Sequence, residues 1–217
     1  MPASVNYQDK IAVLDLGDGE NRFTSDWLDT VEKLIDDVER TRAQALVTSA
    51  TGKFYSYGLD LDWMTDNADK LEGYFLRAQK LFSRILTFPM PTIAAINGHA
   101  FGAGAMLAVA HDYRVMRADR GYFCFPEVDV HVPFTPGMAA LIQGKSTPAA
   151  AITAMSTGHR YVAAEAHTAG YVDGIADQES LVESAIGFVR PLSGKDPATL
   201  GAIKSTMFAS VVAALHQ

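Results

Sequence analysis

Residues 91–110 read PTIAAINGHAFGAGAMLAVA, and this stretch decides the fold that we expect. Thr92 to Ile96 form a continuous apolar run, which is typical of a strand buried on both faces of a parallel sheet. Glycines in the next segment, 98–104, predict a turn, and the small residues of 105–110 predict a helix. The polar Asn97 and the glycines make this a buried strand, turn and helix rather than a membrane span.

The rest of the chain continues this alternation up to about residue 134. Apolar runs predict further strands at 11–16, 45–48 and 113–116, and helical periodicity covers 25–38 and 68–86. Strands that alternate with helices indicate an α/β sheet with crossover helices. Beyond residue 135 the pattern is helical, apart from a short extended piece near 171–172. We therefore expect an α/β core over residues 1–134 and a helical C-terminal region over 135–217.

Composition narrows the classes of partner. The formal net charge is −7, which argues against a broad nucleic-acid surface and against binding to an anionic membrane. A single cysteine, Cys124, gives no disulfide framework and no cysteine metal site. The N-terminal residues do not resemble a signal peptide and the C-terminal residues carry no S-K-L address, so a cytoplasmic location is expected.

Three loops follow predicted strands, at the edge where open α/β sheets bind ligands. The first loop, 53–61, contains Gly58, which permits a close backbone approach. The second loop, 97–105, leads into a helix of small residues whose first N–H groups are free to bind an anion or a polarised oxygen. The third loop, 123–130, places Glu127 among apolar neighbours. Burial would raise the pKa of this carboxyl group, as suits a proton carrier.

The order and wording of these loops resemble the crotonase family, the enoyl-CoA hydratases and isomerases. The resemblance covers 45–48, 54–61, 91–110, 112–119 and the Phe-Pro-Glu of 125–127. Within the family, the chain resembles most the plant-type Δ3,Δ2-enoyl-CoA isomerases, through the amino-acid sequence of segments 17–20, 89–95, 98–100, 111–113 and 116–121. The resemblance implies a crotonase-like ββα-superhelix core with a helical C-terminal region.

The resemblance also implies roles for individual residues. The backbone amides of Leu59 and Ala103 correspond to the oxyanion hole, and Glu127 corresponds to the catalytic glutamate of the third loop. Hydratases of the family carry a second glutamate in the second loop, where this chain has Met106. Since methionine cannot activate water, the resemblance favours a Δ3→Δ2 enoyl-CoA isomerase in fatty acid β-oxidation, with Glu127 as the only proton carrier.

Further substrate contacts are expected from the same loops and from the segment after Glu127. Arg22 and Lys53 are candidates for the coenzyme A phosphates. The other expected contacts to substrate or coenzyme A are Phe54, Ser56, Gly58, Asp60, Gly102, Met106, Pro133 and Phe134. The six histidines show no spacing typical of a metal site, so no metal and no cofactor beyond the coenzyme A of the substrate are expected. By resemblance, the protein is expected to form a homotrimer or a dimer of trimers.

Two alternatives remain open at the level of sequence. The same oxyanion hole could serve another acyl-CoA reaction, such as hydration by Glu127 alone, hydrolysis or decarboxylation. The chain could also bind acyl-CoA, or serve as a partner subunit, without turnover. Met106 favours the non-catalytic alternative, whereas the retained glutamate and glycine loops oppose it.

Overall fold

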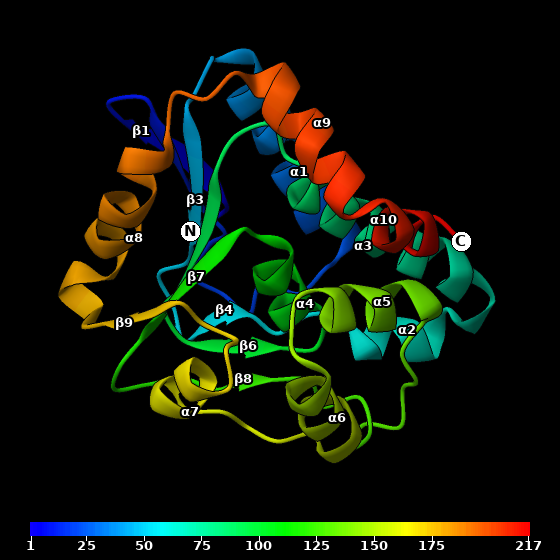
Figure 1. Cartoon of the computed structure of the whole chain (residues 1–217). Coiled ribbons are helices and arrows are strands. Elements are labelled where there is room, and N and C mark those ends of the chain that lie inside the picture. The colour runs from blue at the N-terminus through cyan, green and yellow to red at the C-terminus, as the bar shows by residue number, and fades with distance from the viewer.

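The structure is a computed structural model that describes all residues, 1–217 (Figure 1). Its strands are β1 (Ser4–Gln8), β2 (Ile11–Asp15), β3 (Ala45–Ser49), β4 (Phe54–Ser56), β5 (Thr92–Ile96), β6 (His99–Phe101), β7 (Tyr113–Arg117), β8 (Phe123–Cys124) and β9 (Gly174–Ala176). Its helices are α1 (Ser25–Arg40), α2 (Leu61–Asp66), α3 (Leu71–Leu86), α4 (Ala103–Ala110), α5 (Pro136–Gly144), α6 (Pro148–Thr157), α7 (Ala163–Thr168), α8 (Leu181–Val189), α9 (Pro197–Met207) and α10 (Ala209–Leu215). Short 3₁₀ turns occupy Ala68–Lys70, Gln178–Ser180 and Arg190–Leu192.

Two sheets form the core. The larger has strand order β1-β2-β3-β5-β7-β9, antiparallel only between β1 and β2, and the smaller has order β4-β6-β8. Successive strands alternate between the two sheets: β3, β5 and β7 lie in the large sheet, and the strands that follow them, β4, β6 and β8, form the small one. The expected ββα superhelix is therefore confirmed.

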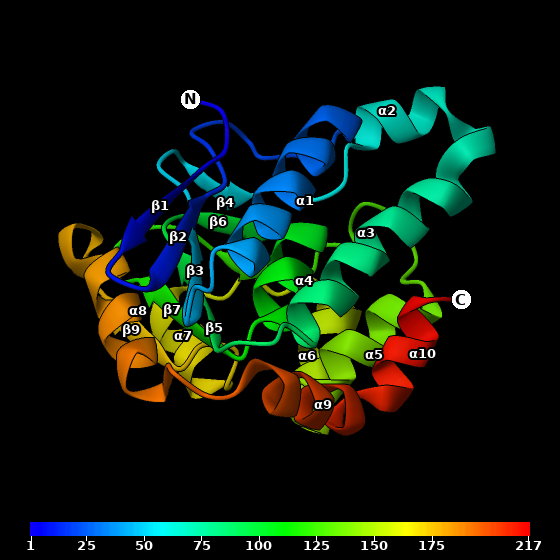
Figure 2. The same cartoon turned by 90° about the horizontal axis from the view of Figure 1, so that it is seen from above.

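Both faces of the large sheet are covered, which explains its continuous apolar strands. On β5, Ile93 and Ala95 face α8, whereas Ala94 and Ile96 belong to the main core with α1, α3 and α4. Figure 2 shows α1 and α3 side by side, and Arg77 of α3 pairs with Glu32 of α1. Thr24 caps α1 by accepting a hydrogen bond from the Trp27 amide, as its sequence position predicts.

The strands that sequence periodicity misses are the short ones. His99–Phe101 lies in the segment expected to be a turn, yet it forms β6 and pairs with β4 and β8. Strands of two or three residues are too short to show an alternating pattern. The extended piece expected near 171–172 lies instead at β9, 174–176.

The C-terminal region is helical apart from β9, and it completes the α/β core. β9 pairs with β7 in the large sheet, and α8 packs against β3, β5 and β7. No single helix is long and apolar enough to cross a membrane. The pair α9 and α10 meets that test only when joined, and it bends by 77° between the two helices.

Candidate active site

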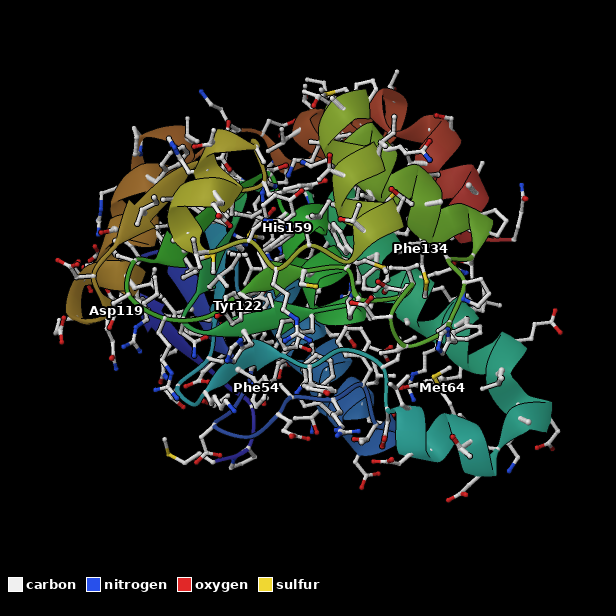
Figure 3. All side chains as sticks on the ribbon, turned by 90° about the horizontal axis from the view of Figure 1, so that it is seen from below. Phe54, Met64, Asp119, Tyr122, Phe134 and His159 are labelled. Atoms are coloured by element: carbon white, nitrogen blue, oxygen red, sulfur yellow. The ribbon has the colours of Figure 1, made fainter.

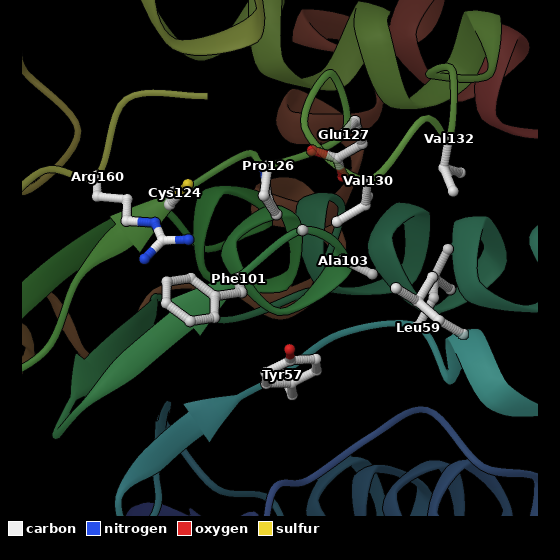
Figure 4. A pocket seen from close by; sticks show the side chains of 12 residues that line it. Tyr57, Leu59, Phe101, Ala103, Cys124, Pro126, Glu127, Val130, Val132 and Arg160 are labelled. Carbon is white, nitrogen blue, oxygen red and sulfur yellow. The ribbon is translucent and has the colours of Figure 1, made fainter. Parts of the chain in front are cut away.

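A pocket opens where the loops after β4, β6 and β8 meet (Figure 4). This agrees with the expectation that open α/β sheets bind ligands at the carboxyl ends of their strands. It holds about 640 Å³ of space, including its open mouth. Most of its walls are apolar. The lining residues are Tyr57, Leu59, Leu61, Phe101, Gly102, Ala103, Cys124, Pro126, Glu127, Val130, Val132 and Arg160.

Glu127 supplies the one carboxylate of this pocket. Its side chain is 8% exposed, and burial raises the pKa of the carboxyl group to about 7. Oε2 is buried without a hydrogen-bond partner. The turn that carries it is closed by backbone hydrogen bonds from Asp129 and Val130 to the Pro126 carbonyl and from Val132 to the Glu127 carbonyl. These bonds fix the backbone of the turn, and burial gives the carboxyl group a pKa at which it can both take and return a proton.

The first two loops meet through their backbones. Gly58 has φ of +90°, and a Cβ at that position would lie 2.6 Å from the Phe101 carbonyl oxygen and 2.8 Å from the Ala103 nitrogen. Only glycine permits both this φ and this approach. Gly102 has φ of +50°, and a Cβ there would lie 3.2 Å from Oε1 of Glu127. The two glycines therefore bring the Ala103 amide, the amide after Gly58 and the carboxylate into one small volume.

The backbone amides of Leu59 and Ala103 donate no hydrogen bond within the chain. Ala103 is the first residue of α4, so its N–H has no partner in the helix. Leu59 follows Gly58, whose own amide donates to Ser56 Oγ and whose carbonyl accepts from the Phe23 amide. Two free donors beside a single carboxyl group can polarise a carbonyl oxygen while a neighbouring carbon exchanges a proton.

Several residues expected to touch the ligand also shape the first loop. Ser56 is fully buried and donates to the Asn21 carbonyl. Asp60 caps α2 and accepts from Arg22. The Arg22 guanidinium also bonds Glu20 and lies near Asp62, so carboxylates occupy its donors. The hydrogen bond with Glu20 is the main cause that raises the pKa of Arg22.

Met106 lies one turn into α4 and is fully buried in the main hydrophobic core. It is absent from the pocket wall. Pro133 and Phe134 line an adjoining depression that also contacts Glu127. Figure 3 shows Phe134 on the side of the molecule where Met64 lies, away from Phe54 and Tyr122.

Basic side chains gather around His99, and one of them, Arg160, lines the pocket. Arg160 places its guanidinium 5.9 Å from the centre of the Phe101 ring (Figure 4). Lys53 places its ammonium 5.2 Å from the centre of the Phe54 ring. Neither forms a salt bridge with a carboxylate. Burial lowers the pKa of His99, which lies among them, and Lys53, Arg120 and Arg160 lower it further.

Sequence reasoning missed Arg160, Phe101 and the two valines of the pocket. Arg160 reaches the pocket because Phe123 and Tyr161 exchange two backbone hydrogen bonds of 2.9 Å. No local pattern announces this bridge between segments more than thirty residues apart in sequence. Tyr57 could have been predicted as a pocket residue from the sequence, since it lies in the first loop. No group of three or more His, Cys, Asp or Glu side chains is arranged to hold a metal ion.

A family model described as enoyl-CoA hydratase/isomerase matches residues 7–217. The chain belongs to this family. It is 36% identical to the peroxisomal enoyl-CoA delta isomerase 2 of Arabidopsis thaliana over 190 residues, which cover 82% of this chain and 79% of the relative. Over 166 residues it is 34% identical to a carnitinyl-CoA dehydratase of Escherichia coli, covering 74% of this chain and 61% of the relative.

Solved structures agree with the crotonase fold. A Mycobacterium tuberculosis structure that carries an enoyl-CoA hydratase name has a TM-score of 0.92 and 26% identity, and the match covers 99% of this chain and 92% of that one. A second structure of the same protein, described as an enoyl-CoA isomerase, has a TM-score of 0.91, 26% identity and coverages of 99% and 94%. The relatives of this family member thus include both hydratases and isomerases.

Proposed function

We propose that this family member is a Δ3→Δ2 enoyl-CoA isomerase. The observation that carries the proposal is the single carboxylate of the pocket, Glu127, beside two free backbone amides in largely apolar walls. A double-bond shift needs one group that removes a proton and returns one. Addition of water is better served by two carboxylates. The isomerases of Arabidopsis thaliana among the relatives support the same assignment.

In the proposed reaction, the thioester oxygen accepts hydrogen bonds from the amides of Leu59 and Ala103. The Glu127 carboxylate takes a proton from C2 of the 3-enoyl thioester, and the electron pair of that C–H bond forms a dienolate whose negative charge rests on the thioester oxygen. The carboxylic acid then returns a proton to C4, and the double bond moves to C2–C3. Each preorganised donor is worth about 3–4 kcal/mol to the transition state.

The apolar walls serve this chemistry by keeping water from the dienolate. Leu59, Leu61, Val130 and Val132 all line the pocket close to the carboxyl group. A pKa of about 7 gives Glu127 comparable fractions of base and acid, so both proton transfers proceed near neutral pH. We propose that no cofactor is needed beyond the coenzyme A of the substrate, because the chain itself supplies the base and the oxyanion donors.

Lys53 and Arg160 are the basic groups best placed for the coenzyme A phosphates, since neither is paired with a carboxylate. Arg22 is less suited, because Glu20 and Asp60 already accept its hydrogen bonds. We also propose a homotrimer or a dimer of trimers. Val128 and Ile152 are exposed apolar side chains of the kind that a subunit contact would cover. Light scattering after size-exclusion chromatography measures the mass of the assembly.

The test of the isomerase is Glu127→Gln, assayed on trans-3-hexenoyl-CoA by the absorbance of the conjugated product. The amide cannot take a proton from C2, so we expect a loss of at least about 1000-fold in kcat, within the range for general acid–base groups. Asp129→Asn is the matched control, because it neutralises an exposed carboxylate two residues away. Near-native activity of Glu127→Gln sinks the proposal.

Product analysis separates the isomerase from the alternatives. Incubation with 2-enoyl and 3-enoyl thioesters, followed by mass spectrometry, distinguishes a double-bond shift from a product heavier by one water or from free coenzyme A. A hydrated product as the main species would favour hydratase activity. Thioester binding without any product would favour the non-catalytic alternative.

A further inference from the structure

A second cavity lies beside the starts of β5 and β7, and residues of α9 form much of its wall. It holds about 830 Å³ of space, including its open mouth. Its wall is apolar with three lysines and one aspartate. The lining residues are Pro91, Asp112, Tyr113, Lys145, Leu192, Lys195, Leu200, Ile203, Lys204, Met207 and Phe208. No part of the proposed isomerase site reaches it.

Lys145 is the unusual member of this wall. Its ammonium donates no hydrogen bond and forms no salt bridge, and its nearest recorded partner is the Phe208 ring, 5.3 Å from Nζ to the ring centre. Burial is the main cause that lowers the pKa of Lys145 to about 8. The charges of Arg114 and Lys204 act in the same direction, and those of Asp112 and Asp173 oppose it. Lys145 is partly exposed, and an unpaired ammonium in such a partly desolvated place favours an accompanying anion.

The carboxylates near Lys145 already have partners. Asp112 Oδ2 accepts from Lys204 Nζ at 2.6 Å and from the Thr92 amide at 2.8 Å. Asp173 Oδ2 accepts from Arg114. Among the lining residues, Lys145, Lys195 and Lys204 outnumber the one carboxylate, Asp112, in a chain whose net charge is −7. The cavity is a local positive site on an acidic protein.

The shape of the wall indicates which anion would fit. Leu200, Ile203 and Met207 line it from one face of α9, and Phe208 closes it where the helix pair bends. No arginine lines the cavity, and Lys204 already donates to Asp112 and to the Met90 carbonyl, so the wall lacks the bidentate guanidinium that favours phosphate. An apolar wall with one unpaired ammonium suits a carboxylate that carries an apolar tail.

We propose that this cavity binds a small organic carboxylate with an apolar body, of the size of a medium-chain fatty acid. Its carboxylate pairs with the Lys145 ammonium, and its tail lies against Leu200, Ile203 and Met207. The site is distinct from the Glu127 pocket and is independent of the proposed isomerase activity.

The test uses octanoate as the probe and the intact chain. Acetylation of lysines by acetic anhydride at neutral pH is followed for each peptide by mass spectrometry, which localises the effect. An ion pair raises the pKa of Lys145, and a rise of one unit lowers the reactive free-amine fraction by about tenfold. We expect saturating octanoate to slow acetylation of Lys145 by about that factor, with the exposed Lys80 unchanged. Unchanged acetylation of Lys145 in millimolar octanoate overturns the proposal.

Matched ligands and variants complete the test. Octanol has the same tail without the charge, and inorganic phosphate has charge without a tail, so neither is expected to protect Lys145. Equal protection by either one overturns the assignment of a carboxylate with an apolar tail. Lys145→Met keeps an unbranched side chain of similar length but removes the ammonium. We expect it to weaken octanoate binding by about tenfold, equivalent to about 1.4 kcal/mol. Calorimetry measures this affinity with the Glu127 pocket filled by a coenzyme A thioester. Lys80→Met is the control, and octanoate affinity that is equal in the two variants contradicts the role of Lys145.

Discussion

At the scale of single residues, the proposed chemistry depends on the surroundings of Glu127. An ordinary glutamate is almost fully ionised at neutral pH, but its carboxylate is a weak base for taking the proton from C2. Burial against Pro126 and the apolar walls raises the pKa of Glu127 to about 7. Sequence shows the apolar neighbours of this residue, but the degree of burial comes from the loops that close over it.

The pH dependence of kcat/KM follows from this shift. Glu127 must be ionised in the free enzyme to take the C2 proton, so activity is expected to rise with pH through an inflection near 7. Below the inflection, kcat/KM should fall by about tenfold per pH unit, as for a single protonation. Initial rates on trans-3-hexenoyl-CoA measure the profile. An inflection near about 4.3, the ordinary glutamate value, would contradict the assigned base.

Gly102→Ala tests the placement of the carboxyl group. The new Cβ would lie 3.2 Å from Oε1 of Glu127, so the carboxylate must shift. We expect kcat to fall by about tenfold or more, since small displacements of a catalytic group are costly. Gly170→Ala is the matched control, because Gly170 also has a positive φ, +79°, with nothing within 4 Å of the added Cβ. Both variants bear similar backbone strain, and equal activities would refute the contact with Glu127.

At the scale of elements, a buried hydrogen-bond chain ties the two sheets to α4. The Tyr55 hydroxyl of β4 lies 2.7 Å from Thr48 Oγ1 of β3, and Thr48 Oγ1 lies 2.9 Å from His111 Nε2. His111 Nδ1 lies 2.8 Å from the Leu107 carbonyl, so that nitrogen is the donor. Burial lowers the pKa of His111 to about 3, so the ring is neutral and Nε2 accepts from Thr48.

Thr48→Val removes the central hydroxyl of this chain without changing its shape. It leaves the Tyr55 hydroxyl and His111 Nε2 buried without their partner, and we expect the free energy of unfolding to fall by about 2–3 kcal/mol. Urea denaturation measures the change. Thr30→Val is the control, since its exposed hydroxyl bonds only the preceding turn of α1, and a loss below about 0.5 kcal/mol is expected there. Equal losses in the two variants would remove the argument for the network.

The elements themselves divide into those that sequence predicts and those that it does not. β3, β5 and β7 are five-residue strands with apolar residues at most positions, and α1 and α3 have clear amphipathic faces, so the sequence pattern finds them. β4, β6 and β8 have only two or three residues each, and their pairing is set by the loops around them. These short strands carry the loops of the site. The local sequence pattern therefore identifies the glycine-containing loops but does not predict the small sheet that aligns them.

At the scale of the whole molecule, the C-terminal helices are part of one packed body. Leu215 of α10 is fully buried against α5 and α3, and Lys204 of α9 bonds Asp112 and the Met90 carbonyl at the start of the large sheet. Contacts of this kind join the C-terminal helices to the middle of the sequence. They hold α9 and α10 over the same cavity that Lys145 enters.

Leu215→Ala measures how firmly this last helix is bound. Deleting a fully buried leucine side chain is expected to lower the free energy of unfolding by about 2–5 kcal/mol, through lost burial and the cavity left behind. Met207→Ala on α9 is the control, because that side chain is 66% exposed and a change within about 0.5 kcal/mol is expected. Thermal unfolding that is equal in the two variants would show that α10 adds little to the stability of the fold.

The sequence by itself determined the α/β class, the family, and the three loops with Gly58, Gly102 and Glu127, because each depends on local pattern or on residue type. Only the tertiary structure decided how close the two amides come to the carboxylate, that Arg160 reaches the pocket, and that Lys145 is left without a partner. These are distances between segments far apart in the chain. They are set by packing and strand pairing, which no short stretch of sequence contains.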